Sequence, residues 1–541
     1  MDLSYAAGEV TPPLLEETIG ANLERTVAAH SEREALVDAV RRWTWTELNS
    51  DVDAIARGLL AAGVQQGDRI GIWAPNCAEW TIVQYATAKI GAILVTVNPS
   101  YRTHEFRYVA NQSGMRFLFA ASSFKASDYH AMIEETHGDL PGLERVIYLD
   151  THDWVGLVTE GYGIPLDDVA ARMRELDPYD PINIQYTSGT TGFPKGATLS
   201  HRNILNNGYF VTETIGLTAE DRLCIPVPFY HCFGMVMANL GCTTHGATMV
   251  IPGPGFDPGA TLRAVQDEHC TVLYGVPTMF IAMQNAGPAQ GGDFASYDLT
   301  SLRSGIMAGS ICPVEVMKRC VNEMHMGEVS IAYGMTETSP VSCQTRTDDD
   351  LERRTATIGR AAPHVEIKIV DPVSRKTLPR GEAGEFCTRG YSVMLGYWEE
   401  PGKTAEAIDD DGWMHTGDLA VMREDGYCVI SGRIKDMVIR GGENIYPREI
   451  EEFLYTHPDV EDVQVVGVPD ATYGEELCAW VKLRAGAQHL DAAAVRAFAD
   501  GKLAHYKIPR YVLVVEDFPM TVTGKIRKVE MREVSRDRLG L

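Results

Sequence analysis

Apolar and polar residues follow two periods along the first part of the chain. Apolar side chains at helical spacing over residues 47–62 predict a helix ending near Gly63, and a second helix is predicted to end at Ile90. Short continuous apolar runs predict buried strands at 69–73, 92–97, 116–120, 248–251 and 271–275. Strands separated by helical stretches predict an α/β fold with a mainly parallel, helix-covered sheet.

The pattern changes beyond about Arg433. Pro447 suits the first turn of a helix whose apolar stripe includes Ile450 and Leu454. Strands are predicted at 463–466, 479–483 and 511–515, with a helix near 491–503. We therefore expect a large N-terminal domain, residues 1–433, and a small α+β C-terminal domain, residues 434–541. The stretch 287–292 is predicted to be a surface loop.

Length and charge narrow the class of protein. A chain of 541 residues is too long for one ordinary core, and its 45% apolar and 23% charged residues are typical of globular proteins. The 48 basic and 74 acidic residues give a formal net charge of -26. Such a surface repels nucleic acid and anionic membranes, so neither is expected as a partner.

The cysteines and the N-terminus indicate a cytoplasmic setting. The 11 cysteines are scattered singly with no Cys-x-x-Cys pair, which favours reduced thiols over disulfides or a zinc motif. The first residues show neither a basic nor an apolar leader, and no uncharged apolar run reaches the roughly 18 residues of a membrane span. We expect a soluble, cytoplasmic protein.

Residues 186–196, Tyr-Thr-Ser-Gly-Thr-Thr-Gly-Phe-Pro-Lys-Gly, are the most informative segment. They follow a strand-like stretch and precede a helix that Ser200 could cap. Glycines let successive N–H groups point at a phosphate, hydroxyls add donors, and Lys195 adds positive charge. The glycine spacing differs from that of a Walker A loop. An ordinary surface turn is the alternative for a short segment of this composition.

This segment resembles the phosphate loop of the adenylate-forming superfamily, which includes acyl- and aryl-CoA synthetases, luciferases and peptide-synthetase adenylation domains. Further segments resemble that family's other motifs in the family's order: 332–338, 415–418, 432–436 and 521–528. The resemblance extends from about residue 20 to the C-terminus. It implies a large N-terminal domain and a small C-terminal domain that moves.

The resemblance implies an ATP site. The β- and γ-phosphates would be held by Thr187, Ser188, Gly189, Thr190, Thr191, Gly192 and Lys195. Glu337 would bind Mg²⁺, which prefers hard carboxylate oxygens, and Thr336 would contact the α-phosphate. Tyr333 would offer its face to adenine. Taken alone, Glu337 is equally a carboxylate at a helix N-terminus and Tyr333 a core tyrosine.

Three charged residues complete the implied adenylation site. Asp418 would accept hydrogen bonds from the ribose hydroxyls, and Arg433 would hold the same sugar from the other side. Lys525 would neutralise the approaching carboxylate and the α-phosphate, an interaction strongest in the transition state. Without the resemblance, each of these residues is an ordinary surface charge.

The same resemblance implies a second half-reaction with coenzyme A. Lys435 would be the pivot about which the small domain rotates between the two steps. Gly441 and Gly442 would line the pantetheine tunnel. The acyl pocket would be formed by His231, Phe233, Gly309 and Gly334. A hydrogen-bonded core histidine remains an alternative for His231.

We therefore predict an acyl-CoA synthetase: ATP and a carboxylic acid give acyl-AMP and pyrophosphate, and coenzyme A then takes the acyl group. Within the family the resemblance is strongest to medium-chain fatty acyl-CoA synthetases, on segments 195–201, 393–398 and 441–447. Alternatives are an aromatic, branched or polycyclic acid, or transfer to a carrier protein. A homodimer is left open. A non-catalytic acyl-nucleotide sensor is disfavoured because Glu337, Asp418 and Lys525 are all present.

Overall fold

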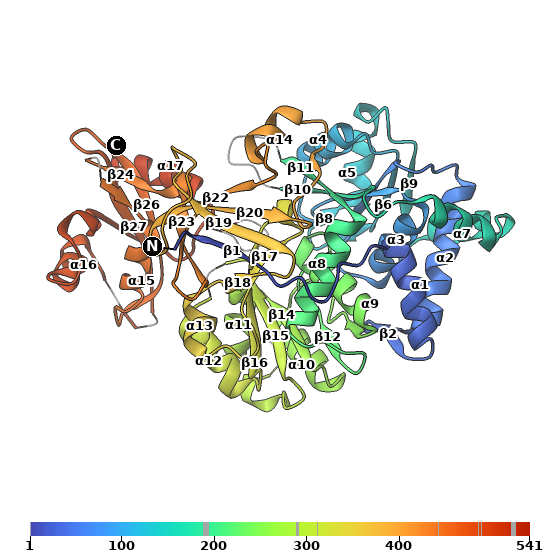
Figure 1. Cartoon of the computed structure of the whole chain (residues 1–541), viewed down its shortest axis with the longest axis horizontal. Helices are drawn as coiled ribbons and strands as arrows, with labels where there is room; N and C mark the ends of the chain where they lie inside the picture. The colour runs from blue at the N-terminus through green and yellow to red at the C-terminus, as the bar shows by residue number, and fades with distance from the viewer. Residues whose placement is uncertain are drawn as a thin grey trace. The chain divides into compact units, whose positions relative to one another are not determined.

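The computed structural model describes residues 2–187, 194–287, 292–310, 312–441, 443–484, 486–487, 489–520 and 526–541. Two compact units are found. The larger unit comprises Ala6–Ile367 and Thr388–Met414. The smaller unit comprises Met1–Tyr5, Lys368–Cys387 and His415–Leu541. Figure 1 follows the chain from blue at the N-terminus to red at the C-terminus.

The first sheet of the larger unit has the strand order β21-β11-β10-β5-β4-β6-β9. The pairs from β10 to β9 are parallel, and the pairs that β11 makes with β10 and β21 are antiparallel. The strands are β4 (Arg69–Trp73), β5 (Ile93–Thr96), β6 (Phe117–Ala120), β9 (Arg145–Tyr148), β10 (Pro181–Thr187), β11 (Lys195–Ser200) and β21 (Gly396–Tyr397). The antiparallel edge places the glycine- and threonine-rich segment between β10 and β11.

The second sheet of the larger unit has the order β18-β17-β16-β15-β14-β12-β13-β2-β3. Its middle pairs are parallel and its edge pairs antiparallel. The strands are β2 (Glu34–Val37), β3 (Arg42–Thr44), β12 (Arg222–Cys224), β13 (Thr248–Val250), β14 (Val272–Gly275), β15 (Ser304–Ala308), β16 (Glu328–Gly334), β17 (Val341–Gln344) and β18 (Arg360–Ala361).

Helices pack on these sheets (Figure 1). They are α1 (Ile19–His30), α2 (Trp45–Ala61), α3 (Ala78–Ile90), α4 (Thr103–Ser113), α5 (Tyr129–Thr136), α6 (His152–Glu160), α7 (Leu166–Glu175), α8 (His201–Thr214), α9 (Gly241–His245), α10 (Pro258–Asp267), α11 (Pro277–Gln284), α12 (Val314–Glu323), α13 (Leu351–Ala356) and α14 (Pro401–Ala407). Between α8 and α9 lies η3 (Phe233–Leu240), a π-helix. Local sequence sets the ends: Thr44 and Glu47 form a capping box on α2, and Gly91 ends α3 in a left-handed conformation.

Two further sheets are built mostly from residues of the smaller unit. One has the order β1-β19-β20-β22-β23, and in the other β25-β24-β27-β26 is extended by β28 beside β27. The elements are β1 (Tyr5–Ala7), β19 (Val365–Val370), β20 (Ala383–Gly390), β22 (Met414–Met422), β23 (Cys428–Arg433), β24 (Val438–Arg440), β25 (Glu443–Ile445), α15 (Pro447–Leu454), β26 (Val460–Asp470), β27 (Gly474–Leu483), α16 (Ala492–Ala499), β28 (Tyr511–Val514) and α17 (Lys528–Leu539). Helices α15 and α17 pack on β26, and Ile450 and Leu454 of α15 are buried as the sequence predicted.

The expected fold class, an α/β fold with a large N-terminal and a smaller C-terminal domain, is confirmed, and each predicted helix and strand named above has a counterpart. The boundary at 433/434 stays a prediction. It falls within the smaller unit, where the 3₁₀ turn η7 (Ile434–Asp436) joins β23 of one sheet to β24 of the other. Of the predicted loop 287–292, residues 288–291 lie outside the described residues.

Candidate active site

The glycine- and threonine-rich segment connects two antiparallel strands. Thr187 at the end of β10 and Lys195 at the start of β11 are register partners, and Thr187 Oγ1 donates to Lys195 O at 3.4 Å. α8 begins directly after β11, and Ser200 caps it in a capping box with Asn203. The predicted cap is therefore present. The segment does not lead directly into the helix, however, because strand β11 lies between them, and the segment connects the two strands of a hairpin.

Some predicted site residues lie outside the part of the chain that the structure describes. They are Ser188, Gly189, Thr190, Thr191, Gly192, Gly442 and Lys525. Their roles stay predictions. The described residues that flank the hairpin connection, Thr187 and Lys195, still locate its two ends.

A buried carboxylate lies beside this hairpin. Glu337 belongs to the 3₁₀ turn η6 (Thr336–Thr338) after β16, and only 5% of its surface is exposed. Its Oε1 accepts hydrogen bonds from Tyr397 Oη at 2.8 Å and from Thr187 Oγ1 at 3.4 Å. Lys195 Nζ lies 4.3 Å from the centroid of the Tyr397 ring. We call Thr187, Lys195, Glu337 and Tyr397 the Glu337 cluster.

The Glu337 cluster has the donors of a divalent-cation site. A carboxylate oxygen with a threonine hydroxyl beside it is a hard, oxygen-only set, which Mg²⁺ prefers. Burial and the Glu337 carboxylate raise the pKa of Tyr397, so its hydroxyl stays protonated and donates to Glu337. Sequence reasoning missed Tyr397 as a site residue, although it lies in segment 393–398, which was used only to judge the substrate.

A buried thiol connects this cluster to the predicted acyl pocket. Cys232 Sγ donates to Gln185 Oε1 at 3.0 Å, and the nearby Thr336 side chain lowers the pKa of the thiol. Burial raises the pKa of Cys232, with a further contribution from the charge of Glu337. The thiol therefore stays protonated. Gln185 in turn donates to Met235 Sδ at 2.9 Å. Strand β10, turn η6 and the start of η3 are thus joined through side chains that the sequence did not single out.

The predicted acyl-pocket residues His231 and Phe233 lie at the start of η3. His231 remains partly exposed, whereas Phe233 is buried with its ring centroid 5.6 Å from that of Tyr274. The Tyr274 ring is wholly buried in β14. The Phe233 and Tyr274 rings therefore pack together where η3 begins.

Side chains of α3 form hydrogen bonds with the π-helix η3. Gln84 Nε2 donates to Met235 O at 3.0 Å, and its Oε1 accepts from Asn239 Nδ2 at 3.0 Å. Tyr85 Oη donates to Asn239 O at 3.1 Å. All of these side chains are buried. A π-helix is rare and often marks a functional site. These buried hydrogen bonds pair polar groups of η3 with α3 and so stabilise the π-helical geometry.

The remaining predicted residues of the larger unit lie where two neighbouring parallel strands end. β15 and β16 pair in parallel, so Gly309 after β15 lies at the same edge as Tyr333 and Gly334 of β16. Tyr333 is partly exposed. A Cβ on Gly334 would lie 1.7 Å from Pro340 O, so only glycine fits the close approach of β16 to β17.

In the smaller unit, Asp418 and Arg433 are register partners of β22 and β23. Arg433 Nε donates to Asp418 Oδ1 at 3.1 Å. Gly417, next to Asp418, donates its N–H to Glu385 Oε1 at 3.2 Å, and Thr416 Oγ1 donates to Phe386 O at 2.7 Å. Bonds to β20 therefore fix the backbone that presents Asp418. The two residues predicted to hold one sugar do lie together.

The predicted coenzyme A residues follow on the chain. Lys435 lies in η7, where its carbonyl accepts from Arg532 Nη2 at 3.1 Å, and Arg532 also pairs with Asp436 at 2.7 Å. Gly441 follows β24 with φ +60°, a left-handed conformation that favours glycine. Its N–H donates to Tyr473 O at 2.8 Å.

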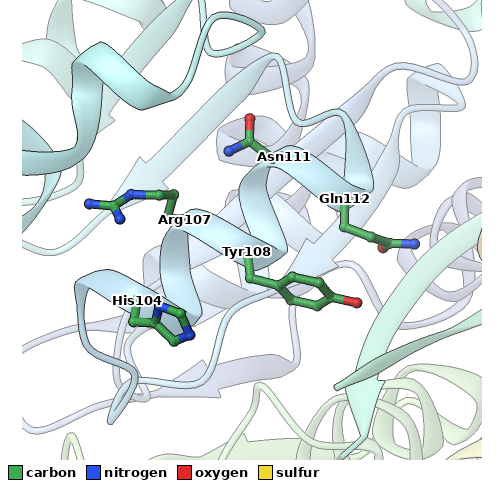
Figure 2. Close-up of a pocket in the computed structure, with 5 residues that line it drawn as sticks. All are labelled: His104, Arg107, Tyr108, Asn111 and Gln112. Atoms are coloured by element: carbon green, nitrogen blue, oxygen red, sulfur yellow. The ribbon is translucent and has the colours of Figure 1, made fainter. Parts of the chain in front are cut away.

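A hollow of about 480 Å³ lies over one face of α4. None of the residues that line it was named from the sequence. Figure 2 shows its lining side chains projecting from this helix, with Tyr108 and Gln112 on the same side. The Tyr108 ring lies edge-on to Tyr186, the residue before Thr187, and Tyr186 Oη donates to Gln112. The hollow therefore borders the strand that leads into the hairpin. His104, Arg107 and Asn111 complete its lining.

Among the described helices, none has both the length and the apolar character needed to cross a membrane.

Comparisons with known proteins agree with this geometry. A family model for AMP-binding enzymes matches residues 23–398, and a model for the AMP-binding enzyme C-terminal domain matches 449–525. The putative acyl-CoA synthetase YngI of Bacillus subtilis (strain 168) is 49% identical over 541 residues, covering 96% of this chain and 97% of its own. The mitochondrial medium-chain acyl-CoA ligase ACSF2 of Danio rerio is 44% identical over 561 residues, covering 99% and 91%.

A solved structure also resembles this chain. ATP-bound MatB from Rhodopseudomonas palustris aligns with a TM-score of 0.85 at 28% identity, covering 97% of this chain and 100% of its own. The predicted enzyme class, an acyl-CoA synthetase, is confirmed by the relatives, and the use of ATP, Mg²⁺ and coenzyme A is consistent with the family. With one model spanning 23–398 and a second spanning 449–525, the chain belongs to the AMP-binding enzyme family.

Proposed function

We propose that this enzyme adenylates a medium-chain fatty acid with ATP and transfers the acyl group to coenzyme A. The observation that carries the proposal is the Glu337 cluster. A carboxylate, a lysine and two hydroxyls converge beside a hairpin whose composition suits phosphate binding. Attack of a carboxylate on a polyanion needs such preorganised charge and donors.

In this proposal Glu337 would hold Mg²⁺, which would neutralise phosphate charge, and the Thr187 hydroxyl beside it would contact the phosphates. Lys195 adds a second positive charge from the start of β11. Tyr397 keeps its proton and holds the Glu337 carboxylate in place at 2.8 Å. Thr336, fixed through Cys232, contacts the α-phosphate.

Nucleotide recognition is assigned to Asp418, Arg433 and Tyr333. Asp418 accepts from the ribose hydroxyls, and Arg433, already paired with it at 3.1 Å, holds the sugar as well. Tyr333 stacks on adenine from the end of β16. Each proposed residue has a side chain of the required chemistry, and the Asp418–Arg433 pair supports a shared target.

The acid is proposed to lie along η3. Phe233 and Tyr274 provide an apolar wall for an alkyl chain, with His231 near its carboxylate end and Gly309 and Gly334 beside it. The ACSF2 relatives named as medium-chain ligases, 41–44% identical over nearly the whole chain, support a medium-chain acid. An aromatic, branched or polycyclic acid is the competing assignment.

The second half-reaction is assigned by resemblance. Lys525 acts in adenylation, the small domain then rotates about Lys435, and Gly441 and Gly442 line the path of pantetheine. Position supports Lys435, because it lies in the short turn between the two sheets of the smaller unit. A separate carrier protein is the competing acceptor.

The proposal is tested by acid-dependent ATP–pyrophosphate exchange. Straight-chain fatty acids of graded length are compared with aromatic, branched and polycyclic acids at equal concentration. We expect the highest kcat/KM with medium-chain acids. A maximum with an aromatic or polycyclic acid would refute the assigned substrate, and no exchange with any acid would refute adenylation.

A further inference from the structure

A second cluster of potential ligands lies in the smaller unit, apart from the Glu337 cluster. Glu385 and Cys387 are two residues apart on β20, so both point to the same face of the sheet. His415 lies on β22, the neighbouring strand. The carboxylate, thiol and imidazole donor atoms all lie within 4.8 Å of one another.

The imidazole nitrogen lies close to both other donors, at distances near those between ligands of one zinc ion. His415 Nδ1 lies 2.9 Å from Glu385 Oε2 and 3.3 Å from Cys387 Sγ. Bonds of about 2.0–2.3 Å in a tetrahedral site put ligand atoms roughly 3.2–3.7 Å apart. An ion therefore needs only small adjustments of the side chains.

The chemistry of the donors selects the ion. A cysteine sulfur with an imidazole nitrogen is a borderline-soft pair, which favours Zn²⁺ over the oxygen-seeking Mg²⁺ and Ca²⁺. Cys387 is 0% and Glu385 6% exposed, so the sheet holds both donors rigidly. The His415 side chain keeps 7% and the Glu385 side chain 9% of its surface exposed, so the cluster is nearly buried but retains a small contact with solvent.

We propose that Glu385, Cys387 and His415 form a Zn²⁺ site, with a water as fourth ligand. On binding, the Cys387 thiol gives its proton to solvent. His415 binds as neutral imidazole through Nδ1, with its proton on Nε2. Glu385 binds through Oε2 and keeps Oε1 on the Gly417 N–H, which lies 3.2 Å away. The metal site thus fixes the backbone one residue before Asp418.

This bond to Gly417 gives the site a structural consequence. Zn²⁺ would join β20 to β22 through side chains and stabilise the smaller unit by mass action. The site uses none of the residues assigned to ATP, the acid or coenzyme A. Its failure is therefore separable from failure of the proposed function.

Cobalt titration of the full-length, reduced and chelator-treated protein tests the site. We expect one Co²⁺ per chain, with a near-ultraviolet thiolate-to-cobalt charge-transfer band that Zn²⁺ abolishes by displacement. Cys387→Ser should lose the band. The matched control Cys77→Ser, a partly exposed cysteine of the larger unit, should retain it.

A second measurement keeps the test valid if Cys387→Ser does not fold. X-ray absorption of the zinc-loaded wild type should show one sulfur and three nitrogen or oxygen neighbours. Absence of a 1:1 charge-transfer band, or a zinc shell without sulfur, would overturn the proposal. The three side chains would then be a hydrogen-bonded brace for the Asp418 backbone.

Discussion

Glu337 is a carboxylate in a place where burial is unfavourable. Only 5% of it is exposed, and its compensation comes from the hydroxyls of Tyr397 and Thr187. Taking an ionised group out of water costs several kcal/mol unless it is paired. Such an arrangement is typical of a residue kept for chemistry.

Replacing Glu337 by Gln therefore separates stability from activity. We expect the free energy of unfolding to rise or to change by less than about 1 kcal/mol, because an amide is easier to bury. Acid-dependent exchange should fall on the order of 100-fold or more, because a ligand for Mg²⁺ is lost. Urea denaturation and exchange measure the two effects. A variant with lower stability and wild-type exchange would show that Glu337 is structural.

His201 at the start of α8 gives a pH dependence of stability. Its Nδ1 accepts from Ile19 N–H at 3.2 Å, and burial lowers the pKa of His201 from 6.5 to about 3. Between these values the unfolded chain binds a proton that the folded protein refuses. Stability is therefore fully present above pH 6.5 and falls with pH below it, by about 1.4 kcal/mol per unit.

His201→Gln removes the group that binds a proton in the unfolded chain. The free energy of unfolding of the variant should therefore fall less steeply as the pH is lowered below 6.5. The urea midpoints of variant and wild type are compared at pH 7.5 and 5.5. The wild type should lose about 1.4 kcal/mol more between them than the variant does. Parallel profiles would contradict a buried neutral histidine.

At the residue scale, the sequence motifs identified several site residues but not the partners that hold them. Thr187, Lys195 and Glu337 were named from sequence and lie together, as do Asp418 and Arg433. Their partners could not be named, because Tyr397 is a common residue 60 positions from Glu337 along the chain and only the fold brings its hydroxyl there.

At the scale of elements, apolar periodicity predicted α2, whose buried residues recur at helical spacing, and continuous apolar runs predicted the central strands, which are buried along their length. Neither pattern could predict η3, since a π-helix depends on tertiary partners. Those partners are Gln84 and Tyr85 of α3, more than 140 residues earlier in the sequence. The strand β11 was missed because the glycine-rich segment suggested a strand followed by a helix.

The bonds between α3 and η3 predict a link between a distant helix and the acyl pocket. Gln84→Met keeps the volume but leaves Met235 O and the Asn239 amide without these partners, at about 1–3 kcal/mol each. We expect a higher KM for the acid and an altered preference for chain length, with the KM for ATP unchanged. Steady-state kinetics over the acid panel measures this.

Tyr85→Phe is the companion variant, because it removes only the hydroxyl, which donates to Asn239 O and also pairs with the Thr243 hydroxyl. It should shift the same parameters in the same direction by a smaller factor. If both variants lower the melting temperature while the acid KM and the chain-length profile stay at wild-type values, the α3 contacts serve stability alone.

For the whole molecule, the two matched family models and the two compact units agree that the chain has a large and a small part. Chain length, the change of pattern beyond Arg433 and the order of the motifs predicted this. The sequence could not predict that β20, β22 and β23 would group with the C-terminal residues, because that depends on packing between segments distant in sequence.

The proposed pivot makes a prediction about the two half-reactions. Lys435→Pro restricts the backbone of η7 and should hold one arrangement of the small domain. We expect acid-dependent exchange and thioester formation from supplied acyl-AMP to change by different factors, whereas Lys435→Ala should leave both near wild type. Unchanged overall turnover in Lys435→Pro would argue against a hinge at this position.

The most direct test of the central claim follows products. Purified protein alone is given ATP, Mg²⁺, a medium-chain fatty acid and coenzyme A, and the products are quantified by liquid chromatography and mass spectrometry. We predict acyl-CoA, AMP and pyrophosphate in equal amounts. Formation of ADP, or accumulation of acyl-AMP with acyl transfer only after a carrier protein is added, would contradict the account.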